Sequence, residues 1–204
     1  MSLSNGGSAP DASSGGLESP NGGPPLRTCV FDLEIASPVE ECPNGWAGAR
    51  RGECGVSALV VWDTGTGRYH LYDASTLEAA VEHLNSVDRI VTWNGKDFDV
   101  PIIEALTAQR VATSHVDLLE LVWKALGTKT KGYKLGAVAL RTLGLAKNGD
   151  AVSAPSLVAQ DRYAELFDYC LNDVHLTRRL WEHVQSTLCV IGVNGEPLVL
   201  MVPS

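Results

Sequence analysis

The 204-residue chain lacks long hydrophobic runs and an N-terminal targeting pattern, and both absences exclude classes of protein. No apolar run approaches the roughly 20 residues that a membrane-spanning helix needs. No basic, apolar and small-residue succession resembling a signal peptide opens the chain. We therefore expect a cytoplasmic protein without a membrane partner.

Cysteines are too few and too irregularly spaced for a disulfide scaffold or a zinc motif. No two of the five have the Cys-x-x-Cys spacing. We expect most of them to be buried thiols in a reducing compartment. They are Cys29, Cys42, Cys54, Cys170 and Cys189.

Basic residues are outnumbered, with 16 Lys and Arg against 24 Asp and Glu and a formal net charge of -8. This balance argues against a nonspecific nucleic-acid coat, which is normally basic. It does not exclude a nuclease, because divalent cations bound by carboxylates invert the local potential that a phosphate meets.

The remaining composition predicts one folded domain after a tail. Residues 1–25 are dominated by Ser, Gly, Asn and Pro and have almost nothing to bury, so we expect them to be disordered. Residues 26–204 are long enough for a single domain with a sizeable core.

Hydrophobic periodicity predicts a mixed sheet with helices on both faces, an α/β fold. Strands are predicted at 28–31, 55–63, 68–72, 89–93 and 111–116. Helices are predicted at 77–84, 101–106, 118–126, 135–143 and 159–188. The segment 35–51, which contains Pro38 and Pro43, is expected to be an irregular loop or lid. A small hairpin is expected across Asn194-Gly195.

The pair Asn94-Gly95 permits two interpretations, because it is also a strong signal for a tight hairpin. Pro101 would interrupt a returning strand, whereas proline is tolerated in the first turn of a helix. We therefore predict strand, turn and helix here.

Carboxylates recur at three places in this order of elements. Asp32 and Glu34 are two apart on a predicted strand, so their side chains share a face, and close like charges favour a bound hard cation. A strand end entering solvent is the alternative. Asp97 and Asp99 follow the fourth strand, where capping of the next helix is an ordinary role. Asp173 lies beside the apolar stripe of the closing helix, four residues after Tyr169.

Phe31-Asp32-Leu33-Glu34, Asn94-Gly95-Lys96-Asp97-Phe98-Asp99-Val100-Pro101 and Tyr169-Cys170-Leu171-Asn172-Asp173 resemble, in order, the three motifs of the DEDDy group of ribonuclease H-like 3'-5' exonucleases. The similarity is greatest to proofreading domains of family B DNA polymerases and to helicase-associated or stand-alone exonuclease domains. It extends over about residues 30–180. It implies a ribonuclease H-like mixed five-stranded sheet flanked by helices.

The resemblance also implies the roles of site residues. Four acids would bind two divalent cations, Mg²⁺ or Mn²⁺, and Tyr169 would be the fifth catalytic residue. Asp97 is the alternative to Asp99, and Asp117 is expected to be a supporting residue. The four acids are Asp32, Glu34, Asp99 and Asp173.

Contacts to substrate are predicted from residue type and position. Lysines of a glycine-containing loop and of the second motif suit phosphates, although a solvated loop explains them equally well. Trp46 suits stacking on a base. The candidates are Asn94, Lys96, Trp46, Lys131 and Lys134.

These inferences predict a metal-dependent 3'-5' exonuclease acting on single-stranded DNA or RNA ends, DNA being favoured. Its expected partners are a helicase, a polymerase or another replication or repair protein. A catalytically silent nucleic-acid-binding module and an endonuclease of the same fold remain the alternatives.

Overall fold

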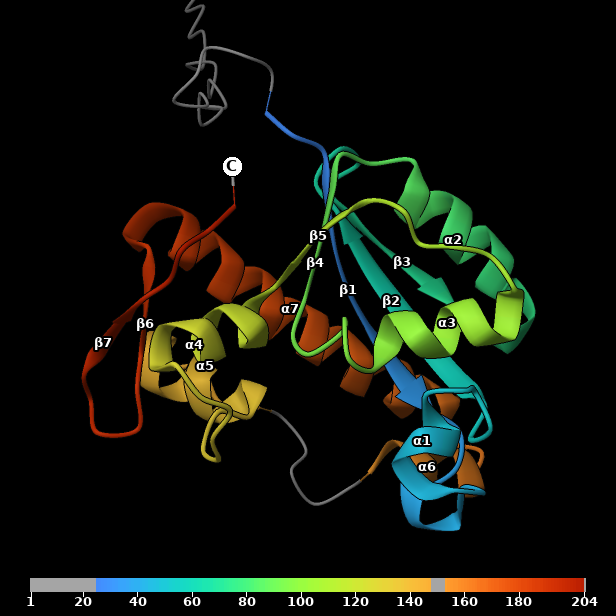
Figure 1. Cartoon of the computed structure of the whole chain (residues 1–204). Helices are drawn as coiled ribbons and strands as arrows, with labels where there is room; N and C mark the ends of the chain where they lie inside the picture. The colour runs from blue at the N-terminus through green and yellow to red at the C-terminus, as the bar shows by residue number, and fades with distance from the viewer. Residues whose placement is uncertain (1–24, 148–152, 204) are drawn as a thin grey trace, which may run out of the picture.

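The computed structural model describes residues 25–147 and 153–203 (Figure 1). Its centre is a five-stranded sheet in the order β3-β2-β1-β4-β5, and a two-stranded hairpin lies outside it. The strands are β1 (Thr28–Ile35), β2 (Val56–Asp63), β3 (Arg68–Tyr72), β4 (Arg89–Thr92), β5 (Ser114–Asp117), β6 (Cys189–Ile191) and β7 (Pro197–Val199). The predicted disordered tail, 1–25, lies almost entirely outside the described residues.

Seven α-helices and two short 3-10 helices are described in these two ranges. The α-helices are α1 (Gly45–Ala49), α2 (Leu77–Asn85), α3 (Asp99–Thr107), α4 (Leu118–Leu126), α5 (Leu135–Leu143), α6 (Ala154–Ala159) and α7 (Tyr163–Thr187). The 3-10 helices are η1 (Val39–Glu41) and η2 (Ala74–Thr76).

The sheet is mixed, as its connections require. The segment 36–55 joins β1 to β2 and a short turn joins β2 to β3, and these three strands pair antiparallel. Helical crossovers lead to β4 and β5, which run parallel to β1. The mixed five-stranded sheet flanked by helices confirms the predicted fold class.

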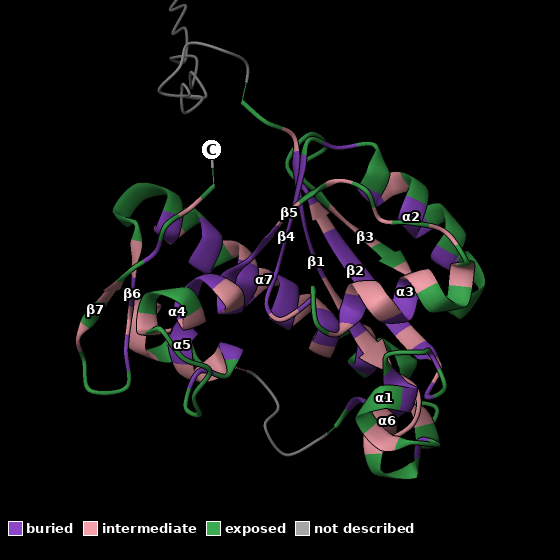
Figure 2. Cartoon of the chain, viewed as in Figure 1, coloured by how far each residue is buried: buried purple, intermediate pink, exposed green. Residues whose placement is uncertain are grey.

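Successive side chains of β1 point to opposite faces of the sheet and pack in two separate hydrophobic cores. Cys29, Phe31 and Leu33 pack on the face covered by α2 and α3. Val30 packs on the opposite face, against α7. Figure 2 shows the buried residues concentrated in the strands between these helices. Since side chains two apart share a face, Asp32 and Glu34 lie on the α7 side.

The helical boundaries differ from prediction at the closing helix. The predicted helix 159–188 corresponds to α7, which begins four residues later, at Tyr163, and the short helix α6 before it was not predicted. Pro155 lies in the first turn of α6, and the chain turns at Asp161, whose φ is 53°. Strand, turn and helix around Asn94-Gly95 are confirmed, as is the β6–β7 hairpin.

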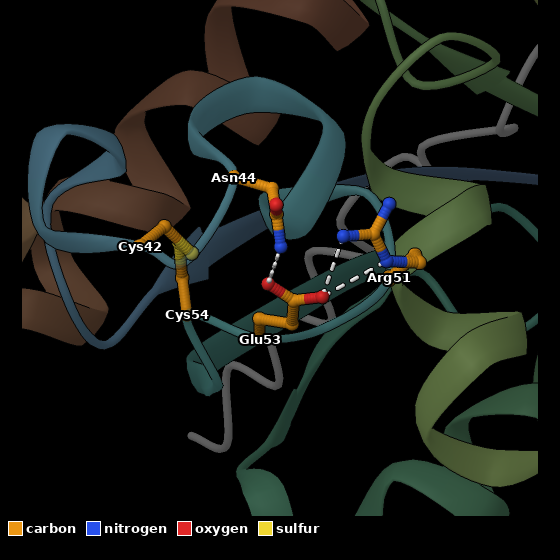
Figure 3. Close-up of a disulfide and its surroundings, with 5 residues drawn as sticks. All are labelled: Cys42, Asn44, Arg51, Glu53 and Cys54. Atoms are coloured by element: carbon orange, nitrogen blue, oxygen red, sulfur yellow. Dashed lines mark hydrogen bonds and ion pairs between the residues drawn. A yellow bond between two sulfur atoms is a disulfide. The ribbon is translucent and has the colours of Figure 1, made fainter.

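The predicted irregular segment between β1 and β2 is more ordered than expected. It contains η1 and α1, and a disulfide joins Cys42 to Cys54 (Figure 3). Beside it Glu53 accepts hydrogen bonds from Arg51 at 2.9 and 2.7 Å. The expectation that cysteines are mostly free thiols holds for Cys29, Cys170 and Cys189 only. The separation of 12 residues between Cys42 and Cys54 and the odd number of cysteines gave no signal of this disulfide in the sequence.

No helix among the described residues is both long enough and apolar enough to cross a membrane.

Candidate active site

Four carboxylates from three elements converge at the end of β1. Asp32 and Glu34 come from β1, Asp99 is the first residue of α3, and Asp173 comes from the middle of α7. We call these four residues the carboxylate cluster. The structure therefore brings together the four predicted metal-binding acids, which are up to 141 positions apart along the chain.

Asp99 is fixed by backbone rather than by another side chain. It is buried, and its Oδ1 accepts a hydrogen bond from the amide of Leu33 at 3.0 Å. Leu33 lies between Asp32 and Glu34, so this bond ties the start of α3 to the acidic end of β1. Burial raises the pKa of Asp99 to about 7, against the effect of the backbone hydrogen bonds.

The charges of the cluster act on one another. Burial raises the pKa of Asp32 well above its usual range, and the charges of Asp99, Asp173 and Glu34 raise it further. Burial and the charge of Asp173 likewise raise the pKa of Glu34 to about 8. Acids that repel one another in a poorly solvated place bind divalent cations well, because the cation stabilises all the ionised forms together.

The donor set fits a hard cation. Carboxylate oxygens are the preferred ligands of Mg²⁺ and Mn²⁺. The sulfur of Cys170 also lies near, 3.9 Å from Asp32 Oδ2, but burial raises the pKa of this thiol well above its usual range. A protonated thiol is a poor ligand, so the usable donors of the cluster are oxygens.

Lys147 is a residue of this site that sequence reasoning missed. Its ammonium donates to Asp173 Oδ2 at 2.7 Å and to the hydroxyl of Tyr169 at 2.9 Å. It also lies 4.3 Å from the centre of the Tyr169 ring. Burial opposes the charge of Lys147, but Asp173 and these hydrogen bonds hold its pKa above its ordinary value.

The position of Lys147 depends on a close approach to α5. A Cβ placed on Gly136 would come within 3.1 Å of Lys147 Cβ, so a glycine at this point leaves room for the segment after the helix. No motif spacing marks Lys147 in the sequence. The one local signal is that a lysine follows the apolar pair Leu145-Ala146.

The other two acids named from the sequence lie outside the cluster. Asp97 is exposed, and its carboxylate forms an ion pair with Lys129 at 3.0 Å. Asp117 is buried and caps α4 by accepting from the amides of Leu119 and Glu120. It also accepts from the amides of Asn94 and Lys96 at 2.9 and 3.0 Å, so it holds the turn that leads to Asp99.

The predicted substrate contacts are spread around the site. Trp46 has 60% of its surface exposed. Its ring packs edge-on against that of Phe98, the neighbour of Asp99, with the two ring centres 5.7 Å apart. Asn94 occupies the turn with a φ of 71°. Lys96 forms an ion pair with Glu120 at 2.7 Å. Lys131 and Lys134 are exposed between α4 and α5 and make none of the described contacts to the cluster.

Arg50 connects the segment that carries Trp46 to the second motif. Its Nε donates to the carbonyl of Asp97 at 2.7 Å. Both Trp46 and Arg50 therefore contact residues that directly precede Asp99, the first residue of α3.

Comparison with known proteins shows to which superfamily this chain with its carboxylate cluster belongs. A family model described as the ribonuclease H superfamily matches residues 49–185. The chain belongs to the ribonuclease H superfamily. Nucleases of this superfamily use divalent metal ions, in agreement with the donor set of the cluster. The matched residues include Asp99, Tyr169 and Asp173, whereas Asp32 and Glu34 precede them.

The fold of this ribonuclease H-like chain also resembles a solved structure. The family B DNA polymerase of the hyperthermophilic archaeon Pyrobaculum calidifontis superimposes with a TM-score of 0.60 at 20% sequence identity. The match covers 81% of this chain and 25% of the polymerase, so the chain spans about a quarter of that protein's length. No curated protein sequence matches the chain.

The raised pKa values predict that the metal-free protein loses stability as pH rises. The pKa of Glu34 is about 8 in the folded chain and near 4.5 when unperturbed. Between these values the unfolded chain releases a proton that the folded chain retains, so rising pH favours unfolding. In chelator, the melting temperature should fall from about pH 5 to about pH 8, and Mn²⁺ should oppose the fall. Equal pH profiles with Mn²⁺ and chelator would contradict the electrostatic account of the cluster.

Proposed function

We propose that the protein is a metal-dependent 3'-5' exonuclease that hydrolyses phosphodiester bonds at the ends of single-stranded nucleic acid. The observation that carries the proposal is the carboxylate cluster, with Tyr169 and Lys147 beside it. Membership of the ribonuclease H superfamily supports nuclease chemistry. The likeness to a DNA polymerase favours DNA over RNA as the substrate.

In this proposal Asp32, Glu34, Asp99 and Asp173 hold two divalent cations, Mg²⁺ or Mn²⁺. Two such ions supply an activated water, neutralise the nonbridging phosphate oxygens and stabilise the leaving 3'-oxygen. Asp32 would have the central part in holding the ions, since the charges of Asp99, Asp173 and Glu34 all act on it.

Tyr169 is proposed to orient the attacking water. Burial raises the pKa of its hydroxyl, so the group keeps its proton and can both donate and accept a hydrogen bond. Lys147 donates to that hydroxyl at 2.9 Å and so restrains its direction.

Substrate contacts are proposed for the residues around the cluster. Trp46 is exposed beside Phe98, and an exposed indole suits stacking on a terminal base. Asn94 and Lys96 follow β4 directly and suit contacts to sugar and phosphate. Lys131 and Lys134 lie in the loop between α4 and α5 and suit contacts to a phosphate farther along the strand.

The setting proposed for this activity is the cytoplasm, with a helicase, polymerase or other replication or repair protein as partner. Structural disulfides are rare in that compartment. Thiol trapping of the protein from cells tests this setting: Cys42 and Cys54 should be found mostly reduced, and a fully intact bond between them in cells would contradict a cytoplasmic protein.

Digestion of 5'-labelled single strands tests the proposed direction of cleavage. With Mg²⁺ or Mn²⁺, a linear DNA strand should give a ladder that shortens from the 3' end, and RNA should shorten more slowly. A circular strand should survive, because an exonuclease has no end at which to begin. Cleavage of the circle would favour the endonuclease, and binding of both strands without cleavage would favour the silent module.

A further inference from the structure

A second group of metal-ligating side chains lies on the other face of the sheet, outside the carboxylate cluster. Cys29 and Asp63 are cross-strand neighbours in the register of β1 and β2, and His83 reaches them from α2. Cys29 belongs to the core under α2 and α3, whereas Asp32 and Glu34 lie on the α7 side. The nuclease chemistry therefore leaves this group without a role.

From the geometry we propose that Cys29, Asp63 and His83 form a binding site for a zinc ion. Their ligand atoms all lie within 4.8 Å of one another. Thiolate, imidazole and carboxylate from one residue each are a ligand set that suits Zn²⁺ rather than Mg²⁺. The inference does not depend on the proposed exonuclease.

The separations of these atoms agree with a tetrahedral site. Ordinary zinc bonds to sulfur, nitrogen and oxygen give ligand-to-ligand edges of about 3.3 to 3.6 Å. His83 Nε2 lies 3.7 Å from Cys29 Sγ and 3.1 Å from Asp63 Oδ2. One nitrogen thus faces both other ligands at nearly the distance that a shared ion requires.

The surrounding residues orient two of the ligands. The second ring nitrogen of His83, Nδ1, is 2.8 Å from the hydroxyl of Tyr72, whose oxygen can accept a hydrogen bond from it. In the tautomer with the proton on Nδ1, this contact would leave Nε2 available to a metal. The other oxygen of Asp63, Oδ1, accepts from the amide of Gly65 at 2.8 Å. Outer hydrogen bonds of this kind fix metal ligands in their binding orientation.

Arg27 supplies the positive charge of the ion-free form. Its Nη2 lies 2.6 Å from Asp63 Oδ2, the oxygen that would bind zinc. The Arg27 side chain is 39% exposed, whereas the Asp63 side chain is fully buried. Arg27 Nε also donates to Asp63 Oδ1 at 3.1 Å, so an entering ion would have to replace the Arg27 contact at Oδ2 while Asp63 stays in place.

Zinc binding would also release the proton of the Cys29 thiol. Burial raises the pKa of the Cys29 thiol to about 12, so the ion-free thiol is protonated at neutral pH. Zinc coordinates the thiolate, and one proton passes from Cys29 to solvent for each ion bound. Zinc affinity should therefore increase with pH.

Cobalt substitution tests the site without using nuclease activity. The full chain carrying Asp32→Asn, which disables the carboxylate cluster, is titrated with Co²⁺ under non-reducing conditions. We expect thiolate-to-cobalt charge-transfer absorption that saturates at one ion per chain and disappears when one equivalent of Zn²⁺ is added. Absence of this absorption would overturn the proposal and leave Arg27, Asp63 and His83 as an ion-pair network.

Matched variants locate the thiolate. Cys29→Ser and His83→Gln should each abolish the absorption, and two variants are used in case one fails to fold. Cys189→Ser, at a free cysteine outside the group, and Cys170→Ser, beside Asp32, should both keep it. Loss of the absorption in Cys170→Ser alone would assign the ion to the carboxylate cluster and overturn the proposal.

Two further variants distinguish a built site from chance binding by one cysteine. Tyr72→Phe should weaken Zn²⁺ binding by about 10-fold, because His83 loses its orienting partner. Arg27→Met should strengthen it, because the competing cation is gone. Unchanged zinc affinity in both variants would contradict the proposed arrangement.

Discussion

Asp32→Asn should lower the rate of metal-dependent nucleic-acid degradation by about 1000-fold or more. Asp32 is half-buried and lies among the other three acids, whose charges all raise its pKa. Loss of its charge removes a ligand common to both proposed cations, which together stabilise the transition state by several kcal/mol. Each 1.36 kcal/mol corresponds to about a tenfold change in rate. Initial rates on a labelled strand with Mn²⁺ measure the loss.

The same variant should be more stable than the natural chain in chelator. Asparagine removes one of four crowded carboxylates that repel one another, so the melting temperature of the ion-free protein should rise. The rise that Mn²⁺ causes in the natural chain should become smaller. This combination separates loss of the site from loss of the fold.

Asp97→Asn is the matched control. Asp97 is exposed and pairs with Lys129, so its replacement should leave degradation close to the natural rate. Equal losses in the Asp32 and Asp97 variants, or full activity in the Asp32 variant, would contradict the assignment.

Lys147→Met should tighten divalent metal binding by about tenfold. The ammonium of Lys147 lies 2.7 Å from Asp173, so an incoming cation competes with a charge already in place. Such a contact is worth about 4 kcal/mol at 4 Å in an effective dielectric constant near 20. Partial exposure of the pair lowers this value, and we take the expected effect as about tenfold, which corresponds to about 1.4 kcal/mol. Calorimetric titration with Mn²⁺ measures the change.

The ion-free form of this variant should be less stable, because Asp173 loses its compensating charge while its burial remains. Methionine keeps much of the length of the side chain, so loss of packing against Gly136 contributes little. Lys131→Met, at an exposed lysine of the loop between α4 and α5, should change neither property. Weaker Mn²⁺ binding in Lys147→Met would show that the ammonium assists the cations rather than competing with them.

The sheet and most helices could be predicted because their signals are local. Alternating residues define β1 to β3, and Pro101 decides between a hairpin and a helix after Asn94-Gly95. The ends of helices and strands could be predicted less well. The predicted closing helix begins too early, because the chain turns between α6 and α7 at Asp161, a non-glycine residue with a positive φ that residue type alone does not indicate.

The carboxylate cluster could be assembled from the sequence because each acid has a motif around it. Lys147 has none. Its contacts to Tyr169 and Asp173 arise when two segments 22 and 26 positions apart meet, and no residue spacing encodes that meeting. The Cys42–Cys54 disulfide escaped prediction for the same reason, since it depends on how η1 and α1 fold back toward β2.

Release of a 3'-terminal label tests the central claim most directly. A linear single strand labelled on its last nucleotide is incubated with the natural chain and with Asp173→Asn, in Mg²⁺ or in chelator. The account predicts that a labelled nucleoside monophosphate is the first product, that it requires the metal, and that Asp173→Asn does not form it. Release in chelator, or at the natural rate by Asp173→Asn, would contradict a metal-dependent exonuclease built on the carboxylate cluster.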